Sequence, residues 1–368
     1  MTEPLVIGID ASRAVRSNRT GTENYSFELI KQIINLDHKD HLRLYAPHES
    51  FEKIGSGPQV EWKILPEARL WSQLTLSKEL RRNEPDVLFV PSHVIPLLSK
   101  VKSVVTIHDL AYRFFPQSYS NFDRRYINFA TSVSVSKASK IIVPSHATKN
   151  DLVKLHKIDP KKIVVIPLGY NEDVFNPNKD YQDSPMKRPY FFYVNRLEYR
   201  KNTQLLIDAF VLLAKERKDV DLVLAGKAGY GYVDIERKLN NLPAAIRSRI
   251  ITPGYLPQYD SARYMKHALA LVCPSIYEGF GLPILEAMAI GTPVIASNSS
   301  SLPEVAGDAA ILLPPNNPLS WAASMSRIIH QKELSASLRA KGIIQAKKFS
   351  WAAAAKATLE VIHDVAKG

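Results

Sequence analysis

The chain has 368 residues, enough for two domains of ordinary size, and its 45% hydrophobic and 23% charged residues are typical of a globular protein. Its formal net charge is +12, which would suit nucleic acid, an anionic membrane surface or a phosphate-bearing substrate. The basic residues form short clusters without the interleaved aromatic side chains that stack on bases, so we expect no nucleic-acid partner.

The sequence also predicts the cellular compartment. No segment reaches the roughly 18 consecutive apolar residues that a membrane helix needs. The first residues, MTEPLVIGIDASR, carry Glu3 early and predict a strand, not a signal peptide. The single cysteine, Cys273, excludes an internal disulfide and fits a reducing cytoplasm. We expect a cytoplasmic protein. Arg124 and Arg125 could attract it to the inner face of the cell membrane, although a solvated helix face is the simpler explanation of that cluster.

Short apolar runs alternate with longer amphipathic ones through the first half of the chain. Helical spacing of apolar residues predicts helices at 22–36, 121–139 and 145–156, the last with Ser145 as its N-cap. The apolar runs between them end in Pro, Ser, Asp or Gly and predict strands. These strands are PLVIGID (4–10), HLRLYAP (41–47), DVLFVPS (86–92), SVVTIHD (103–109), KIIVPS (140–145) and KIVVIPLG (162–169).

The alternation stops at residues 169–189, a polar stretch with three prolines, and then resumes to the end of the chain. The pattern predicts an α/β protein of two doubly wound, Rossmann-like domains with parallel sheets that face a central cleft. The expected parts are a domain at 1–170, a linker at 171–188, a second domain at 189–348, and a C-terminal helix at 349–368 packing back towards the first domain.

Ligands bind at the carboxyl ends of parallel strands, so the residues that follow strands are the candidates for function. The stretch YEGFGLPILEAMAIGTPVIAS (277–297) follows the predicted strand LALVCPS (269–275) and begins with a turn, after which a helix starts near Pro283. The helix start offers free N–H groups to a phosphate, and Glu286 could accept two hydrogen bonds from a ribose diol. Glu278 would lie where a second polyol could bind. A capped surface helix is the alternative, but it explains Glu286 among apolar neighbours poorly.

Two further loops carry candidate residues. Arg196 and Lys201 follow the strand YFFYV, and two cations on one loop suit a diphosphate; a solvated turn in which Glu198 pairs with one of them fits equally well. His108 follows a strand of the first domain and could bind a sugar hydroxyl or carry a proton, whereas by itself it would be read as a structural histidine. Gly21 lies at the start of the first helix and by itself indicates only a helix cap.

Several alternative motifs are missing or misplaced. The chain contains no G-x-x-x-x-G-K-[ST] phosphate loop, and AGKAGYG (225–231) does not match a dinucleotide-binding fingerprint. The DVD triplet (219–221) resembles a metal-binding D-x-D, but it precedes a strand and is better explained as a turn. No paired histidines indicate zinc, so we expect neither a metal nor a cofactor.

Together these segments resemble the retaining glycosyltransferases of family four, which have the GT-B fold. EGFGLPILE is similar to the E-x7-E signature of that family, with Glu278 and Glu286 as its two glutamates. YVNRLEYRKN is similar to the family's diphosphate-binding loop, although Asn195 replaces the common glycine. TIHDL matches the segment of the sugar-contacting histidine, and the segments at 163–175, 291–297 and 302–315 also match in order and spacing.

The resemblance implies roles for these residues. Arg196 and Lys201 would neutralise the diphosphate leaving group, and no metal would be needed. Glu286 would hold the ribose, and His108 would reach a sugar hydroxyl from the first domain, which serves the acceptor side. The residues expected to bind the donor are Gly21, Arg196, Lys201, Glu278, Gly279, Phe280, Gly281, Leu282 and Glu286; those expected to take part in catalysis are His108, Glu278, Arg196 and Lys201. The N-terminal RTGTENYSFELI departs from the common form, which leaves the acceptor open.

The expected function is transfer of a hexose from a nucleotide sugar to a saccharide or lipid-linked saccharide acceptor in cell-surface polysaccharide biosynthesis. HDLAYRFFPQSYS (108–120) is most similar to bacterial mannosyltransferases, so GDP-mannose is the preferred donor and UDP-glucose the next. The alternatives are a nucleotide-sugar-binding regulator without turnover, or another GT-B enzyme such as a phosphorylase or an epimerase. An epimerase would need acid-base carboxylates around the sugar that the sequence does not offer.

Overall fold

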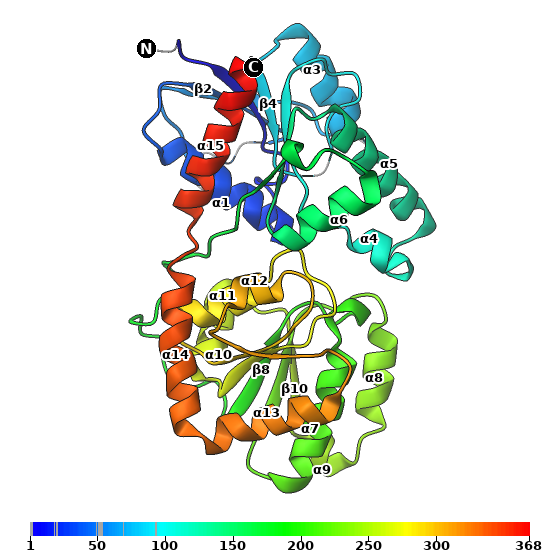
Figure 1. The fold of residues 1–368 in the computed structure, drawn as a ribbon, viewed down its shortest axis with the longest axis vertical. Coiled ribbons are helices and arrows are strands. Elements are labelled where there is room, and N and C mark those ends of the chain that lie inside the picture. The colour runs from blue at the N-terminus through cyan, green and yellow to red at the C-terminus, as the bar shows by residue number, and fades with distance from the viewer. Residues whose placement is uncertain are drawn as a thin grey trace. The chain divides into compact units, whose positions relative to one another are not determined.

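The computed structural model describes residues 3–17, 19, 21–48, 50, 54–68, 70–92 and 94–368. The chain divides into two compact units (Figure 1). The first unit comprises Met1–Arg113, Asn121–Gly169 and Ser350–Gly368, and the second comprises Phe114–Ser120 and Tyr170–Phe349. Each unit is a parallel sheet with helices on its faces, and each has its own buried core.

The first unit contains a seven-stranded sheet in the order β3-β2-β1-β4-β5-β6-β7, with every neighbouring pair parallel. The central strands β4 and β5 are buried along their whole length, as apolar strands covered by helices on both faces must be. The strands are β1 (Val6–Asp10), β2 (His41–Ala46), β3 (Val60–Ile64), β4 (Val87–Val90), β5 (Ser103–Thr106), β6 (Lys140–Val143) and β7 (Ile163–Val165).

The helices connect these strands, and the C-terminal helix α15 returns to the same sheet. It packs against α1, beside which Figure 1 shows it in red, and against β4, β5 and β6. Gly169 permits the close crossing where α15 begins, because a Cβ there would lie 2.1 Å from the Trp351 nitrogen. The helices are α1 (Gly21–Asn35), α3 (Ser77–Arg82) after the π-helical turn η1 (Ser72–Leu76), α4 (Ala111–Phe114), α5 (Asn121–Lys137), α6 (His146–His156) and α15 (Trp351–Lys367), with a short 3-10 turn η3 (Pro160–Lys162).

The second unit contains a six-stranded parallel sheet in the order β10-β9-β8-β11-β12-β13. Its strands are β8 (Tyr190–Val194), β9 (Asp221–Ala225), β10 (Ile250–Gly254), β11 (Ala270–Cys273), β12 (Val294–Ser297) and β13 (Ile311–Leu313). Its helices are α7 (Thr203–Glu216), α8 (Tyr232–Asn240), α9 (Ala244–Arg247), α10 (Gln258–His267), α11 (Leu282–Ala289), α12 (Leu302–Ala306), α13 (Pro318–His330) and α14 (Lys332–Ala346), with short 3-10 turns η2 (Pro116–Ser118) and η4 (Tyr199–Lys201).

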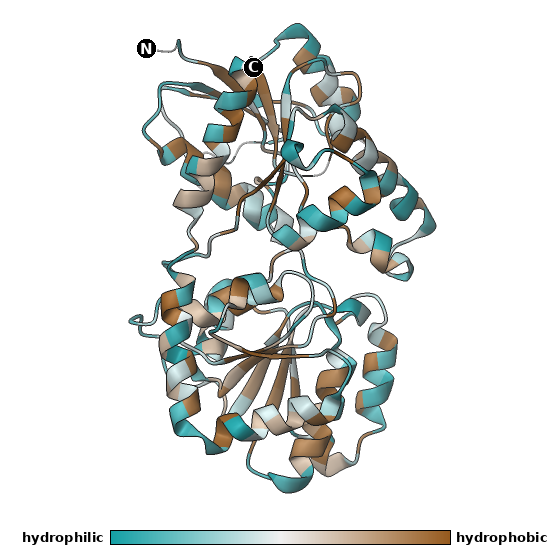
Figure 2. Cartoon of the chain, viewed as in Figure 1, coloured by the Kyte–Doolittle hydropathy of each residue, from teal (hydrophilic) through white to brown (hydrophobic). Residues whose placement is uncertain are grey.

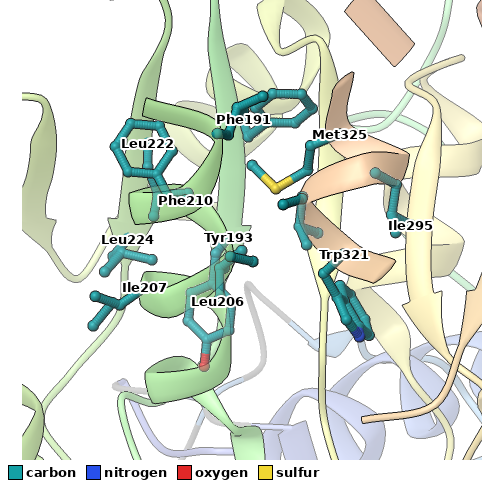
Figure 3. Packing of buried hydrophobic residues seen from close by; sticks show 14 of the residues in the cluster. Phe191, Tyr193, Leu206, Ile207, Phe210, Leu222, Leu224, Ile295, Trp321 and Met325 are labelled. Atoms are coloured by element: carbon teal, nitrogen blue, oxygen red, sulfur yellow. The ribbon is translucent and has the colours of Figure 1, made fainter. Parts of the chain in front are cut away.

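The alternation of side chains along β8 divides the core of the second unit between two faces of the sheet. Phe191 and Tyr193 point to the face covered by α7 and α13, where they join a cluster that includes Trp321 (Figure 3). Phe192 points the other way and stacks on Tyr264 of α10, with ring centroids 5.5 Å apart. Figure 2 accordingly shows the strands as predominantly hydrophobic, while the surrounding helices alternate between hydrophobic and hydrophilic residues.

The predicted strands and helices are present, with two differences in the connections. Strand β3 was not predicted, because Val60–Ile64 (VEWKI) carries charged residues on a sheet edge and lacks a continuous apolar run. Residues 171–188, predicted as a linker, contain no helix or strand but fold onto the second unit: Tyr181 is buried, and Lys266 of α10 donates a hydrogen bond to the Pro177 carbonyl at 2.7 Å.

Candidate active site

In the second unit, the candidate residues follow the two strands between which the strand order reverses. Arg196 comes directly after β8, and Glu278 comes a few residues after its neighbour β11. In an open parallel sheet, the connections that leave two such strands run to opposite faces and leave a crevice at their carboxyl ends. At this point the chain brings Lys201, in the loop after β8, into contact with Glu278, 77 residues later in the sequence.

That contact is an ion pair between two buried side chains. The Nζ atom of Lys201 lies 2.5 Å from Oε2 of Glu278, and the two residues are only 4% and 7% exposed. Glu278 Oε1 accepts two more hydrogen bonds, from the Asn195 side-chain amide at 3.0 Å and from the Ser275 hydroxyl at 2.8 Å. The carboxylate is thus held by three donors from two loops, the one after β8 and the one after β11, which fixes its position and its charge.

The electrostatics of this cluster follow from its burial and its charges. Burial by itself would raise the pKa of the Glu278 carboxyl, but the positive charges of Lys201 and Arg200 and the hydrogen bonds from Lys201 and Ser275 hold that pKa below its ordinary value. Burial, together with the Glu278 charge, raises the pKa of the nearby Cys273 thiol to about 11. Glu278 is therefore ionised at neutral pH, and Cys273 is a protonated thiol that cannot act as a nucleophile.

Asn195 is a site residue that the sequence analysis treated only as a departure from a family pattern. Besides its bond to Glu278, its Oδ1 accepts a hydrogen bond from the Arg196 backbone N–H at 3.1 Å. Gly226 makes room for this turn, because a Cβ on Gly226 would lie 1.8 Å from the Asn195 carbonyl oxygen. The amide side chain thus ties the loop after β8 to the loop after β11.

The two arginines of the loop after β8 differ in whether they are free to bind a ligand. Arg200 donates a hydrogen bond from Nε to Glu198 at 2.6 Å, which is the intraloop pairing that the sequence left open, although with Arg200 instead of Arg196 or Lys201. Arg196 is exposed, and within the described part of the chain its guanidinium has no ion pair or hydrogen bond. Arg196 is therefore a cation at the carboxyl end of β8 that can accept an anionic ligand.

The loop from Glu278 to Gly281 is held by serines that the sequence analysis did not single out. The Ser301 hydroxyl donates to the carbonyl oxygens of Glu278 at 2.9 Å and Phe280 at 2.8 Å, and Ser300 also donates to the Glu278 carbonyl, at 2.6 Å. These serines belong to the run SNSSS directly after β12, a polar run after a buried strand that could have indicated the role. They stabilise a turn in which Gly279 and Phe280 are buried.

This turn leads into α11, and the N-terminus of α11 offers backbone N–H groups as hydrogen-bond donors. Gly281 has a φ of +111°, and a Cβ at that position would lie 2.6 Å from Leu302 Cδ2, so both conformation and space require glycine. Among the described residues, the backbone N–H groups of Gly281 and Leu282 find no acceptor. They lie at the positive end of the α11 dipole, as an anion-binding site requires.

Glu286 lies about one turn into α11 and is half-buried among apolar neighbours. No hydrogen bond or ion pair to its carboxyl is found in the part of the chain that the structure describes. Burial raises the pKa of this carboxyl from 4.5 to about 8. A half-buried acid without a protein partner is suited to accept or donate hydrogen bonds to a bound ligand.

In the first unit, His108 follows β5 and is half-buried. Its Nε2 donates a hydrogen bond to the Pro91 carbonyl at 2.8 Å, since a carbonyl can only accept, and its ring packs edge-on against Tyr25 with centroids 4.6 Å apart. Burial lowers the pKa of His108, outweighing the Pro91 hydrogen bond and the charge of Asp109. The neutral imidazole thus carries its proton on Nε2, which makes Nδ1 the accepting nitrogen.

Gly21, the other candidate in the first unit, is the first residue of α1. It is exposed, and a Cβ added there would meet no heavy atom of the described residues within 4 Å. His108 and Gly21 belong to the first unit, whereas Arg196, Lys201, Glu278 and Glu286 belong to the second.

Neither a metal site nor a membrane span emerges from the described residues. No group of three or more His, Cys, Asp or Glu side chains there is arranged to hold a metal ion. Of the DVD triplet, Asp219 pairs with Arg217 at 2.7 Å, and Asp221 begins β9. No helix in the described ranges is both long and apolar enough to cross a bilayer.

Two protein-family models match consecutive parts of the chain. The model described as Glycosyltransferase Family 4 matches residues 19–174, and the model described as Glycosyl transferases group 1 matches residues 174–345. The second match contains all the candidate residues of the second unit, and the first contains Gly21 and His108.

Individual relatives are similar over most of their length. The O-antigen chain mannosyltransferase B of Escherichia coli is 28% identical over 371 residues, which cover 93% of this chain and 96% of that protein. The O-antigen chain mannosyltransferase RfbU of Salmonella typhimurium strain LT2 is 25% identical over 337 residues, which cover 87% of this chain and 90% of that protein.

Solved structures support the architecture. The Anabaena protein Alr3699/HepE, solved in complex with UDP-glucose, matches with a TM-score of 0.75 and 17% identity, covering 98% of this chain and 99% of that one. The two observed parallel sheets and such structural matches confirm the predicted fold class, two doubly wound α/β domains of the GT-B type.

Proposed function

The chain belongs to the glycosyltransferases of group 1 and family four, and from this premise we propose that it is a retaining hexosyltransferase that works without a metal ion. It transfers a hexose from a nucleotide sugar to a saccharide or lipid-linked saccharide in cell-surface polysaccharide biosynthesis. The Escherichia coli and Salmonella typhimurium relatives named as O-antigen mannosyltransferases support mannose as the transferred sugar and polysaccharide assembly as the setting.

The observation that carries the proposal is the set of groups at the carboxyl ends of β8 and β11. A guanidinium (Arg196), the N–H groups at the start of α11 and a carboxyl (Glu286), all without a partner among the described residues, follow the neighbouring strands β8 and β11 of one unit. Arginine and helix N-termini bind phosphate, and a carboxylate accepts two hydrogen bonds from a vicinal diol. A ribose with an attached diphosphate presents these groups in this order, so we assign the nucleotide of the donor to the second unit.

Lys201 and Glu278 have a related role in the proposal. A lysine ammonium has three N–H groups, and Lys201 uses one of them for Glu278, so it can also donate to a phosphate oxygen. Negative charge develops on the diphosphate as the glycosidic bond breaks, and fixed cations stabilise it without reorganisation. Glu278, with the backbone at Phe280 and Gly281, orients the sugar. This arrangement supplies the charge that a metal ion would otherwise provide.

The proposal assigns the sugar hydroxyl to His108 and places Gly21 beside the donor. The His108 imidazole is neutral, and its Nε2 bond to Pro91 fixes the orientation of the ring. GDP-mannose is the preferred donor and UDP-glucose, the ligand of the Anabaena structure, is the second candidate.

A panel of nucleotide sugars, offered with mannosylated acceptors, tests the proposal through release of the nucleoside diphosphate. GDP-mannose should be consumed fastest. Arg196→Ala should weaken donor binding about tenfold or more, because it removes a charge-assisted hydrogen bond. His108→Ala should lower turnover with little change in nucleotide affinity. Binding without turnover of any nucleotide sugar would instead indicate a regulator, and unchanged donor affinity in Arg196→Ala would remove the assigned diphosphate site.

We further propose that the protein works at the cytoplasmic face of a membrane, bound through α5. Phe122 and Phe129 are 67% and 55% exposed and, seven residues apart, lie two turns apart on the same side of this helix, with exposed Arg125 between them. Leu98, 63% exposed, lies in the adjacent loop, where Lys137 of α5 donates a hydrogen bond to the Ser99 carbonyl at 3.0 Å. Exposed aromatic and aliphatic side chains beside a basic residue suit an anionic lipid surface.

A further inference from the structure

A pocket of about 260 Å³ opens in the first unit, and none of the residues assigned above is part of its lining. It lies at the carboxyl ends of three neighbouring strands. Its lining includes Arg13 and Arg16, which follow β1, His48, which follows β2, and Trp71 and Glu67, which lie in the connection after β3. Ligands of open parallel sheets bind at this edge, so the pocket is in the position expected of a substrate site.

The described lining of the pocket carries two guanidinium groups and one carboxylate. Arg16 is exposed and forms no ion pair with the described residues. Arg13 bonds Glu23 through Nη1 at 3.0 Å, and its remaining nitrogens make no further contact within the described part of the chain. His48 uses Nε2 to donate to the Val15 carbonyl at 3.1 Å, which orients its ring. Glu67 is the one acidic residue against two guanidinium groups on the described lining.

Aromatic rings form another part of the lining. Trp71 is 9% exposed, and its indole N–H is buried without a hydrogen-bond acceptor. Tyr126 of α5 is half-buried and lines the same pocket. Trp and Tyr rings give a rigid apolar surface with a polar donor, which suits the face of a sugar ring. The pocket thus combines an anion-binding part with a ring-binding part.

The pocket is electrostatically coupled to His108. The largest effect on the His108 pKa is burial, but the charge of Glu23 raises that pKa and the charge of Arg13 lowers it. Arg13, which lines the pocket and pairs with Glu23, thus acts electrostatically on His108 within the same unit. A charged molecule bound to Arg13 would lie within electrostatic reach of the residue to which we assign the transferred sugar.

We propose that this pocket binds the phosphate or diphosphate of the acceptor, with Arg13 and Arg16 on the anion and Trp71 and Tyr126 against the attached sugar. The proposal rests on the transferase function and specifies its acceptor as a phosphorylated saccharide. Two guanidinium groups, each with a pair of parallel N–H donors, match the negative charge and the several oxygens of a phosphate group. A carboxylate needs only one guanidinium group.

Calorimetric titration of the full-length protein tests this proposal without turnover. The probes are mannosyl diphosphate with a short alkyl chain and methyl mannoside, and Arg196→Ala serves as the background that weakens binding at the donor site. We expect the phosphorylated probe to bind at least tenfold more tightly. Arg16→Gln should remove most of that preference. Arg82→Gln, which deletes an equally exposed arginine at the end of α3 in the same unit, should retain it.

The tryptophan provides a second readout. Binding of the phosphorylated probe should change the intrinsic fluorescence, and Trp71→Phe should remove this change while Trp62→Phe retains it. The phosphorylated acceptor could be a lipid-linked sugar or a soluble sugar phosphate. Comparing a long-chain lipid diphosphate in vesicles with the soluble probe distinguishes them. Tighter binding in vesicles supports a lipid-linked acceptor, and equal binding supports a soluble sugar phosphate.

The outcomes separate this proposal from the proposed function. Equal affinity for both probes, or an unchanged preference in Arg16→Gln, would overturn the pocket assignment even if a nucleotide sugar is consumed. A failure of every nucleotide sugar to react would overturn the transferase function, while phosphate-dependent binding sensitive to Arg16 would still support an anion site here.

Discussion

Lys201 and Glu278 show how single residues at this site combine structural and chemical roles. Each is buried and charged, and each compensates the desolvation of the other. Removing one partner leaves an uncompensated buried charge, which costs more than the pair contributes. The positive charge that the proposed reaction needs is therefore held in place by the carboxylate that also orients the sugar.

Lys201→Ala should lower the free energy of unfolding by about 3–5 kcal/mol, because the Glu278 carboxylate loses its buried counter-ion. Adding Glu278→Gln to the Lys201→Ala variant should recover part of that lost stability, since the amide side chain carries no charge. Chemical denaturation of the two single variants and the double variant measures the coupling. Additive losses would show that the two side chains do not stabilise one another.

Glu286 is the opposite case, a carboxyl that has no hydrogen-bond or ion-pair partner among the residues that the structure describes. Its pKa is raised from 4.5 to about 8, so the folded protein binds a proton that the unfolded chain has released between these pH values. Stability therefore falls as the pH rises from about 4.5 to about 8. Such a group is retained at a cost to stability, which supports a role in ligand binding.

Glu286→Gln should abolish this dependence, because glutamine does not ionise. Below pH 5 the variant and the parent should unfold alike. Above pH 8 the variant should be more stable than the parent by about 2 kcal/mol. A shift of one pKa unit corresponds to roughly 1.4 kcal/mol, and we reduce the total because the Glu286 carboxyl is partly exposed and screened by solvent. Melting curves of the ligand-free proteins between pH 4.5 and 9 measure it. A constant difference across this range would contradict the raised pKa.

At the scale of helices and strands, local sequence signals determine where elements begin. Ser145 was predicted as the N-cap of α6, and its side chain accepts a hydrogen bond from the Thr148 N–H at 3.1 Å. The predicted start of α11 near Pro283 lies one residue from the observed Leu282. Edge strand β3 was missed, because its charged residues pair in the tertiary structure, as Arg43 of β2 does with Glu61 at 2.8 Å.

The exposed face of α5 leads to a prediction at this scale. Replacing Phe122 and Phe129 together by Ser should weaken binding to anionic vesicles at least tenfold, since burying each ring contributes about 1.5–3 kcal/mol. Cosedimentation of the protein with anionic vesicles at increasing salt concentration measures this loss of binding. A double variant of Leu319 and Ile344, equally exposed aliphatic residues of the second unit, is the matched control and should bind as the parent does. Equal losses in both variants would remove α5 as the binding face.

At the scale of the whole molecule, the chain builds the same strand order twice and then returns to the first unit. The order of six strands around β1 and β4 is repeated around β8 and β11. Helix α15 places Trp351, Leu359 and Ile362 into the first unit, and His363 bonds Asp40 at 2.7 Å. The first unit is therefore incomplete until the last residues of the chain are in place.

A chain that ends at Phe349 should lose the first unit and keep the second. The deleted helix buries one Trp and four aliphatic side chains, on the order of 10 kcal/mol, which is comparable with the stability of a whole domain. Limited proteolysis should degrade the first unit and leave a fragment from about Tyr170 that binds the nucleotide. Ile362→Ala in the full chain should have a milder effect of about 2–5 kcal/mol. Lys356→Ala, on the exposed side, should have almost none.

The periodicity of apolar residues was enough to predict the fold class and nearly every strand, because side-chain burial in parallel sheets and amphipathic helices leaves a local pattern. The same reading proposed Arg196, Glu278 and Glu286 as candidates, since polar residues after buried strands and a carboxyl within an apolar helix are conspicuous.

The partners of those residues depend on contacts between segments distant in the chain, which no local pattern records. The Lys201–Glu278 pair, the bracing of the turn by Ser300 and Ser301, and the pocket around Arg13 and Trp71 form only where adjacent parallel strands bring their following loops together. Charge and burial at each position, and so each pKa, are set by that three-dimensional arrangement.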